Sequence, residues 1–299
     1  MPKIIVVGSS NTDMVIQSER IPRAGETILG GSFFMNPGGK GANQAVAAAR
    51  LGGDVHFICK LGNDVFGEMA LKQFQQEGIH TEFVMTDSKH PSGVALINVD
   101  AQGENSITVA SGANGALRSV DIDQADALFK AGDVLLIQLE TPRETVWHSI
   151  KKAHKKGLKV ILNPAPAAEI PAEIYPCLFA LTPNESETEL LTGIQVDSLL
   201  KAKEAGRCLL SKGLKHLIIT MGSQGAFYLS TEKDLFIPTQ AVQAVDTTAA
   251  GDCFNGALAV ALSQTKDWEA AIQFACEAAT LSVTQMGAQA SMPYLADLS

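Results

Sequence analysis

The chain has 299 residues, of which 46% are hydrophobic, and it carries a formal net charge of −9 at pH 7. This hydrophobic content suffices for one large core or two modest domains and argues against intrinsic disorder. The acidic balance argues against a nucleic-acid-binding surface, which needs clustered Lys and Arg. The one basic cluster, at residues 151–156, is interpreted as the solvated face of a helix.

The cysteines and histidines follow no familiar structural motif. The five cysteines are scattered, odd in number and form no C-x-x-C, so a disulfide framework and a zinc site are both poorly supported. The six histidines are dispersed and are interpreted as ordinary surface or core residues. The apolar run near the N-terminus ends at Gly8, and no apolar run approaches the roughly 18 residues of a membrane span. We therefore expect a cytoplasmic protein that contacts neither membrane nor nucleic acid.

Short apolar runs, most of them rich in β-branched residues, recur along the chain and are typical of strands buried on both faces. They lie at residues 4–8, 55–62, 134–140, 158–163, 178–184 and 216–222. Helical patterns occupy residues 42–53, 144–157 and 201–213, and each ends at a glycine suited to a helix C-terminus. This alternation predicts parallel βαβ units and an α/β fold, with a doubly wound, mostly parallel sheet flanked by helices.

Two segments depart from this rhythm, at about residues 14–36 and 92–111, where apolar and polar residues alternate. The second predicts a hairpin that turns at residues 101–103. Such segments in a parallel α/β chain indicate a small antiparallel sheet outside the core. A lid over a site, an oligomer interface and an edge decoration are all compatible with it. We expect a single domain, residues 1–299, with a β-lid formed by these two segments and a core formed by the remainder.

Polar residues collect after the predicted strands, where open α/β sheets bind their ligands. Asn11 and Asp13 lie two apart, so in an extended segment they point to the same side, and an amide with a carboxylate suits vicinal hydroxyls. An Asx turn is the alternative. A glycine-rich stretch at residues 36–49 leads into a helix with Lys40 and Asn43 near its start, which suits a close approach to a ligand or simply a tight turn.

The stretch VDTTAAGDCFNGAL, residues 245–258, places Asp252 at the start of an apolar helix. Small residues precede it, at Ala249, Ala250 and Gly251, so a phosphate can approach the unpaired N–H groups of the helix start. An aspartate beside such an anion hole suits a base that deprotonates a hydroxyl during phosphoryl transfer. The alternative is an aspartate favoured by the helix dipole, which leaves the small residues unexplained. The P-loop, dinucleotide and nucleophile-elbow signatures are absent.

The segments GGKGANQA (38–45), PNESE (183–187) and DTTAAGDCFNGAL (246–258) resemble the phosphofructokinase-B-type sugar kinases, most closely their ribokinase group. The resemblance runs from GSSNTD near the start to GAQASMP (287–293). It implies a ribokinase-like fold and transfer of the γ-phosphoryl of ATP to the 5-hydroxyl of D-ribose with Mg²⁺. A kinase of the same family for deoxyribose, another sugar or a nucleoside is the alternative. A non-catalytic sugar-binding protein and an oxidoreductase are the alternatives from other classes.

The resemblance also assigns roles by matching positions. Asp252 would be the catalytic base, and the backbone of Ala249, Ala250 and Gly251 the anion hole. The sugar site would be lined by Asn11, Asp13, Gly39, Lys40, Asn43 and Glu140, together with Asp252. The ATP site would comprise Asn184, Glu187, Thr220, Met221, Gly222, Ser223, Gln224, Gly225, Gly251 and Cys276. Asn184 and Glu187 would lie near Mg²⁺. Cys276 replaces the polar ring or amide that often stands near the adenine.

A monovalent cation, usually K⁺, and a dimer complete what the resemblance implies. The K⁺ ligands on matching positions would be Asp246, Thr248, Ser282, Gln285, Gly287 and Ser291, several of them through backbone carbonyls. Ribokinases pair through their antiparallel lids, so a homodimer formed through the β-lid is expected. The partners would then be a small-molecule sugar, ATP and a second copy of the chain.

Overall fold

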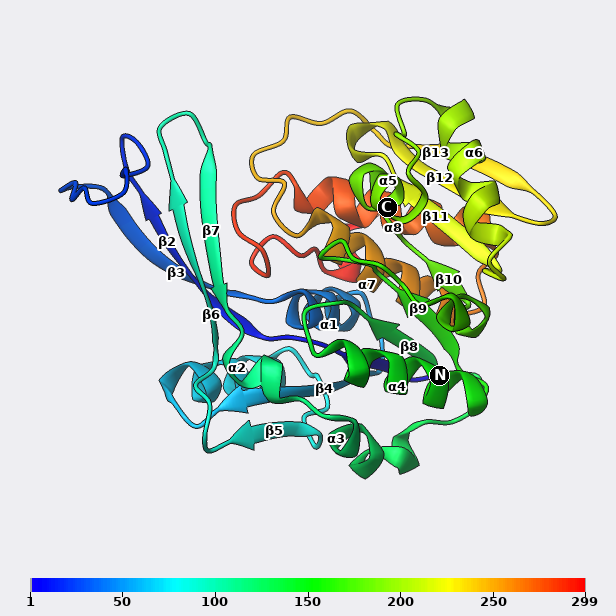
Figure 1. Cartoon of the computed structure of the whole chain (residues 1–299), viewed down its shortest axis with the longest axis horizontal. Coiled ribbons are helices and arrows are strands. Elements are labelled where there is room, and N and C mark those ends of the chain that lie inside the picture. Colours follow the sequence, from blue (N-terminus) through cyan, green and yellow to red (C-terminus); the bar gives the residue numbers. More distant parts are fainter. Residues whose placement is uncertain (1, 299) are drawn as a thin grey trace.

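The computed structural model describes residues 2–298 and is built on a nine-stranded sheet with the order β13-β12-β11-β10-β9-β8-β1-β4-β5 (Figure 1). Seven neighbouring strands, from β11 to β5 in that order, pair in parallel, and β12 and β13 add two antiparallel pairings at one edge. The strands are β1 Ile4–Val7, β4 Val55–Gly62, β5 Val84–Asp87, β8 Val134–Ile137, β9 Lys159–Leu162, β10 Ala180–Leu181, β11 His216–Thr220, β12 Gly225–Ser230 and β13 Asp234–Pro238. The predicted α/β fold is thus confirmed.

Helices cover both faces of this sheet, because its central strands are apolar on both sides. Along β1, Ile4 and Val6 enter one core, and Ile5 and Val7 enter the other, as the two-residue period of a strand requires. The first core is closed by α1 Lys40–Arg50, α2 Val65–Gln76, α7 Ala250–Ser263 and α8 Trp268–Ser282, and the second by α3 Ser119–Gln124, α4 Arg143–Lys155, α5 Glu185–Thr192 and α6 Leu199–Leu210.

Several predicted elements end earlier than their apolar runs. The run at residues 178–184 forms only the two-residue strand β10, because Pro183 removes a donor and Asn184 already caps α5. The run at residues 134–140 is a strand only to Ile137.

Within residues 2–298, no helix is long and apolar enough to cross a membrane.

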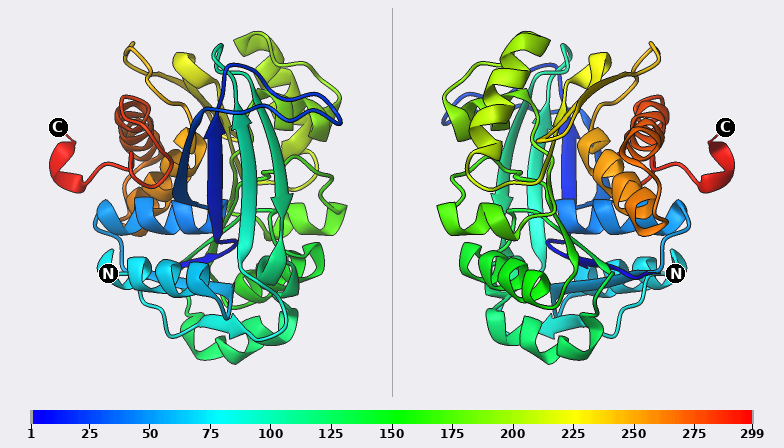
Figure 2. Two further views of the ribbon diagram at one scale, coloured as in Figure 1. Left: turned by 90° about the vertical axis from the view of Figure 1, so that its left-hand side faces the viewer. Right: turned by 90° about the vertical axis from the view of Figure 1, so that its right-hand side faces the viewer.

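A second sheet, with the order β3-β2-β6-β7, stands along one side of the body (Figures 1 and 2). It comprises β2 Asn11–Gln17, β3 Ser32–Gly38, β6 Gly93–Val99 and β7 Asn105–Ala110. The β2–β3 and β6–β7 pairings are antiparallel as expected, and β6 turns into β7 at the predicted residues. The central β2–β6 pairing is parallel, because it joins two segments that both leave the body in the same direction. We call this four-stranded sheet the lid sheet.

The two faces of the lid sheet differ. Asn11 and Asp13 lie on one face, and the alternating residues of β2 lie on the other. That other face is apolar and exposed, and cross-strand pairs place on it Met14, Ile16, Phe33, Met35 and Leu96. One face of the lid sheet is therefore polar near the body, and the opposite face carries an exposed apolar group on β2, β3 and β6.

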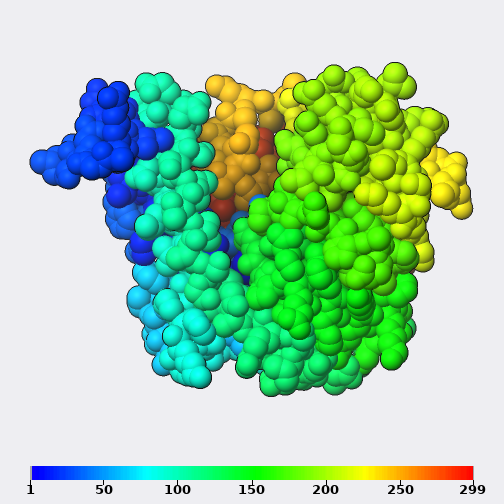
Figure 3. All heavy atoms as spheres, viewed as in Figure 1, coloured from blue at the N-terminus to red at the C-terminus, as the bar shows by residue number. Residues whose placement is uncertain are grey.

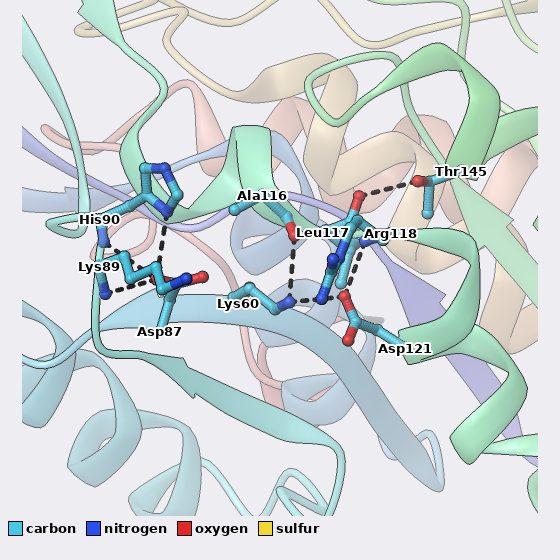
Figure 4. A network of polar contacts seen from close by, with 9 residues as sticks. All are labelled: Lys60, Asp87, Lys89, His90, Ala116, Leu117, Arg118, Asp121 and Thr145. Atoms are coloured by element: carbon cyan, nitrogen blue, oxygen red, sulfur yellow. Dashed lines mark hydrogen bonds and ion pairs between the residues drawn. The ribbon is translucent and has the colours of Figure 1, made fainter.

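Polar contacts lie at two of the connections between the lid sheet and the body, before β6 and after β7 (Figure 4). On the way in, the Asp87 carboxylate accepts hydrogen bonds from the backbone N–H groups of Lys89 (2.8 Å) and His90 (3.0 Å). On the way out, the buried Lys60 ammonium donates to Asp121 (2.6 Å) and to the carbonyl oxygen of Ala116 (3.0 Å). The base of the lid sheet is thereby held to β4 and α3. Between the lid sheet and the body the surface is hollowed, and the orange segment that contains α7 is visible inside the hollow (Figure 3).

Candidate active site

Helix α7 begins at the edge of this hollow. Ala249 adopts the left-handed conformation with φ 61°, and the helix runs from Ala250. Gly251 borders open space, since a Cβ atom added there meets no atom within 4 Å. Asp252, in the first turn, is only 4% exposed. The structure thus combines an accessible helix start with a buried carboxylate directly after it, which is the arrangement that an anion site beside a base requires.

Side-chain amides of α1 hold both oxygens of Asp252. Asn43 Nδ2 donates to Oδ2 at 2.9 Å, and Gln44 Nε2 donates to Oδ1 at 2.9 Å. Gln44 is itself held, because its Nε2 also donates to Asn163 Oδ1 (3.1 Å) and its Oε1 accepts from Gln138 Nε2 (2.5 Å). Burial raises the pKa of Asp252, whereas the charge of Lys40 and the two amides favour its ionised form. The carboxylate is therefore fixed in direction and is a stronger base than an exposed aspartate.

The close contact of α1 with α7 makes this network possible. A Cβ atom at Gly256 in α7 would lie 2.8 Å from the carbonyl oxygen of Gln44 and 2.7 Å from Ala47 Cβ, so only glycine allows the two helices to approach this far. Asp252 on α7 and its amide partners on α1 are consequently placed by a single helix–helix contact.

The start of α1 lies against β2 and carries the other polar residues of the hollow. Gly39 caps α1 with φ 87°, and a Cβ atom there would lie 2.7 Å from the backbone nitrogen of Asn11. Asn11 Oδ1 accepts a hydrogen bond from Asn114 Nδ2 at 2.8 Å, which fixes the Asn11 amide. Burial raises the pKa of Asp13 to about 6, with further contributions from the charges of Glu140 and Asp252.

Glu140 and Lys40 complete a charged group around Asp13 and Asp252. Glu140 Oε2 accepts from Ser9 Oγ (2.5 Å) and from the backbone nitrogen of Lys40 (3.0 Å). The nearby carboxylates, Asp252 foremost, raise the pKa of Lys40, so its ammonium stays charged. The structure thus brings one cation among several carboxylates at the mouth of the hollow.

Asn184 and Glu187 form a capping box at the start of α5. Asn184 Oδ1 accepts from the backbone nitrogen of Glu187 (2.8 Å), and Glu187 Oε2 accepts from that of Asn184 (2.9 Å). Asn184 also forms an isolated parallel β-bridge with Thr220, at the end of β11. Burial raises the pKa of Glu187, and Asp252 and Lys40 are among the charges that act on it. Glu187 thereby belongs to the same electrostatic group as the start of α7.

Residues 220–225 continue from β11 through a short 3₁₀ turn, Gly222–Gln224, into β12. The carbonyl oxygen of Gln224 accepts from the backbone nitrogen of Thr239 at 3.4 Å, and Thr239 hydrogen-bonds with Thr280 of α8. Thr239 and Thr280 line a cavity of about 300 Å³ that Cys276 also lines, and burial raises the pKa of this thiol to about 11. The remaining lining residues are Pro238, Gln240, Val242, Gln273, Glu277, Leu281, Thr284, Asp297 and Leu298.

The residues matched to K⁺ ligands form a compact junction between two loops. Asp246 accepts from the backbone nitrogens of Thr248 and Gly287, both at 2.9 Å. Burial raises the pKa of Asp246, but these hydrogen bonds outweigh burial and hold the pKa below its usual value. The hydroxyls of Ser282 and Ser291 donate to backbone carbonyls three residues earlier. Gln285 donates its backbone N–H to the Ser282 carbonyl at 3.3 Å. The two loops are joined by the Val283 carbonyl, which accepts from the backbone nitrogen of Asp246 at 3.2 Å.

The comparisons with known proteins agree with this geometry. Residues 1–295 match the model of the pfkB family carbohydrate kinases. The chain belongs to this family. Among its relatives, this pfkB kinase is 44% identical to a ribokinase of Haemophilus influenzae, over 97% of this chain and 95% of the other. It is 40% identical to a deoxyribokinase of Salmonella typhi, with the same coverage. Its structure resembles that of the Arabidopsis thaliana ribokinase complexed with ribose and ATP, with TM-score 0.92, 33% identity and coverage of 99% of this chain and 97% of that chain.

Sequence reasoning missed the second layer of this pfkB kinase site. Gln44, Gln138 and Asn163 are buried amides that orient Asp252 directly or through one another. Gln289 orients Asn43, because its Nε2 donates to Asn43 Oδ1 at 3.1 Å. One signal for these amides was available in the sequence, namely the polar pair Asn43–Gln44 among the small apolar residues of the helix. Buried amides need hydrogen-bond partners, so this pair indicated that further polar residues lie next to it.

Proposed function

We propose that this pfkB kinase is a ribokinase, which transfers the γ-phosphoryl of ATP to the 5-hydroxyl of D-ribose and yields ribose 5-phosphate and ADP. The observation that carries the proposal is the buried, doubly hydrogen-bonded Asp252 beside the accessible start of α7. The full-length similarity to ribokinases supports the choice of sugar.

In the proposed reaction, Asp252 accepts the proton of the 5-hydroxyl as its oxygen bonds to the γ-phosphorus. The bond between that phosphorus and the β,γ-bridging oxygen breaks, and ADP leaves with the electron pair. The backbone of Ala249, Ala250 and Gly251 stabilises the charge on the transferring group. Such N–H groups act best when they are held in position before the reaction. The N–H of Ala250 donates to the Thr247 carbonyl at 3.3 Å, so it would have to leave this long hydrogen bond to serve the phosphoryl group.

The sugar is proposed to bind among Asn11, Asp13, Gly39, Lys40, Asn43 and Glu140. Asp13 and Glu140 accept hydrogen bonds from sugar hydroxyls, and Asn11 both donates and accepts. Asn43 contributes the second hydrogen of its amide, because its other groups are engaged with Asp252 and Gln289. Asn11 and Asp13 belong to the lid sheet, so closure of that sheet would bring them onto the sugar and exclude water.

ATP is proposed to lie along Thr220, Met221, Gly222, Ser223, Gln224 and Gly225, with the adenine in the cavity that Cys276 lines. Asn184 and Glu187 fit a divalent cation near the phosphates, since oxygen ligands are those that Mg²⁺ prefers. Mg²⁺ would neutralise the charge that develops on the phosphates. Because both residues now cap α5, loading the site would draw on groups that stabilise that helix start.

K⁺ is proposed to bind at the junction of residues 245–248 with residues 282–291, through Asp246, Thr248, Ser282, Gln285, Gly287 and Ser291. The lowered pKa of Asp246 supports this assignment, because an ionised carboxylate favours a cation there. Since the serine hydroxyls already donate to neighbouring carbonyls, both serines would contribute backbone oxygens.

Two chains are proposed to pair through the apolar face of the lid sheet, defined by Met14, Ile16, Phe33, Met35 and Leu96. An exposed apolar surface of this kind marks an association site.

A cytoplasmic location is proposed as well, because all five cysteines are free.

The proposal is tested by measuring ADP release with ATP and Mg²⁺ across D-ribose, 2-deoxy-D-ribose, D-fructose and a nucleoside. The expected result is the highest kcat/KM on D-ribose, with a rise on adding K⁺. A highest value on deoxyribose would instead favour the second candidate, a deoxyribokinase, which the 40% identity to such an enzyme supports. Binding of sugar without turnover on any substrate would contradict both.

A further inference from the structure

A cluster of two histidines and an aspartate lies at the amino end of β4, remote from the sugar and nucleotide residues at the carboxyl ends of the strands. Asp54 directly precedes β4, and His56 is its second residue. His80 follows α2 and pairs with His56 in an isolated parallel bridge. Backbone hydrogen bonds fix this bridge, from Phe57 to the His80 carbonyl (3.1 Å) and from His80 to the Val55 carbonyl (2.9 Å). The three side chains are therefore brought together by the main chain.

The ligand atoms of this cluster converge. Asp54 Oδ1 lies 3.1 Å from His80 Nε2 and 3.5 Å from His56 Nε2. The two imidazole rings are stacked, with centroids 4.2 Å apart and planes 9° from parallel. Among residues 2–298, no other group of three or more His, Cys, Asp or Glu side chains has its ligand atoms all within 4.8 Å of one another.

Two imidazoles and a carboxylate are a ligand set for a divalent transition metal. Zn²⁺ binds such nitrogen and oxygen atoms at about 2.0–2.2 Å, which places ligand atoms of a tetrahedral ion about 3.4 Å apart. The distances to Asp54 already match that spacing. The stacked rings must open slightly so that both lone pairs point to one ion. His80 has room to turn, because its side chain is 47% exposed, whereas that of His56 is 11% exposed.

A fourth residue orients the cluster. Glu82 Oε1 lies 3.6 Å from His80 Nδ1, on the side of the ring away from Asp54. Of the two carboxylates, the closer to this ring is Asp54, 3.1 Å from Nε2. When a metal ion takes the place of the Nε2 proton, Glu82 is positioned to approach and accept from Nδ1–H, as is common for metal-binding histidines.

We propose that Asp54, His56 and His80 form a binding site for a divalent transition-metal ion of the Zn²⁺ class, with water completing the coordination and Glu82 orienting His80. The ion would join the beginning of β4 to the connection between α2 and β5. Binding there stabilises the folded chain, because the unfolded chain does not hold the three ligands together. The site is distinct from the Mg²⁺ and K⁺ positions of the proposed function and does not depend on it.

The test is calorimetric titration of the untagged, full-length protein with ZnCl₂, without sugar or nucleotide. One ion per chain is expected to bind, with a rise in melting temperature. His80→Ala should weaken binding more than tenfold, and Glu82→Gln about 10–100-fold, the usual effect of removing such an orienting partner. Co²⁺ should give the visible absorption of a tetrahedral site in the wild type and not in His80→Ala.

His148→Ala is the matched control. His148 is also a partly exposed histidine paired with a carboxylate, Asp123, at 2.8 Å, but it has no second histidine in the pair. Binding should survive in this variant. Equal binding in His80→Ala and wild type, equal loss in both variants, or no Zn²⁺ binding to the wild type would each overturn the proposal. Kinase turnover of His80→Ala should equal that of wild type, so failure here is distinguishable from failure of the proposed ribokinase activity.

Discussion

The central sheet and the lid sheet differ in what covers their strands. Every residue of β1 and β8 is buried, whereas every residue of β7 is exposed. A strand buried on both faces is fixed by its packing, and a strand exposed on both faces is fixed mainly by its ladder hydrogen bonds. We infer that the central sheet provides the stability of the molecule and that the lid sheet is free to serve binding and association.

The proposed site lies where these two regions meet. The base and the amides that orient it belong to the body, on α7 and α1. Asn11 and Asp13 belong to β2, the lid strand that continues from the central sheet. Changes in the body should therefore alter the chemical step, and changes in the lid sheet should alter sugar binding and assembly.

The largest expected effect is on the body side, in Asp252→Asn. The fold should be retained, because asparagine has the same shape and its Oδ1 still accepts from one of the two partner amides. Loss of a general base lowers kcat by about 10²–10⁴-fold. Steady-state ADP release measures the loss, and the unfolding midpoint checks the fold. Asp123→Asn, at an exposed position, is the control, and near-wild-type turnover of Asp252→Asn would refute its role as base.

A matched pair of truncations compares the stability of the two regions. Leu135→Ala removes a fully buried side chain of β8 and should lower the free energy of unfolding by about 2–5 kcal/mol. Ile107→Ala, in β7, removes a side chain that is 53% exposed and should change it by less than about 0.5 kcal/mol. Urea unfolding measures both. Similar losses in the two variants would show that the lid sheet is as strongly packed as the core.

Association is expected to depend on the lid sheet alone. Phe33→Asp places a charge on the apolar lid face, where its burial in a dimer is costly. Sedimentation should show dimers of the wild type and mainly monomers of the variant at equal concentration. Glu82→Gln, outside the lid sheet, should leave the dimer intact. A wild type that sediments as a monomer would exclude this interface.

A pH dependence that originates in the lid sheet is the last expected effect. The pKa of Asp13 is raised to about 6, so this group is protonated below that pH and ionised above it. Since the ionised form accepts two sugar hydroxyls, kcat/KM for ribose should fall about tenfold per pH unit below 6 and level off above it. Asp13→Asn should have a lower kcat/KM at all pH values, and its kcat/KM should no longer change with pH around a midpoint of about 6. An unchanged pH profile in that variant would assign the pH dependence to another group, such as Asp252.

Much of the central sheet could be predicted from the sequence, because a strand buried on both faces leaves a continuous apolar run, as at residues 4–8. Asp252 was also predictable, since a carboxylate before an apolar helix is costly without a use. Gln44 and Gln138 were not, because their partners lie 208 and 94 residues away in the chain and no spacing reveals them. The parallel β2–β6 pairing and the meeting of His56 with His80 likewise depend on tertiary contacts alone.

The contact between α1 and α7 at Gly256 has a consequence for how such a kinase changes its substrate. The atoms proposed to deprotonate the acceptor are placed by two body helices, and several of the atoms proposed to recognise the acceptor are carried by a strand of another sheet. Substitutions in β2 or β6 can therefore alter which sugar is accepted while leaving the proton transfer intact. A laboratory that seeks a new acceptor should vary the lid strands and keep the glycine of α7, because one added methyl group there would displace the base from its partners.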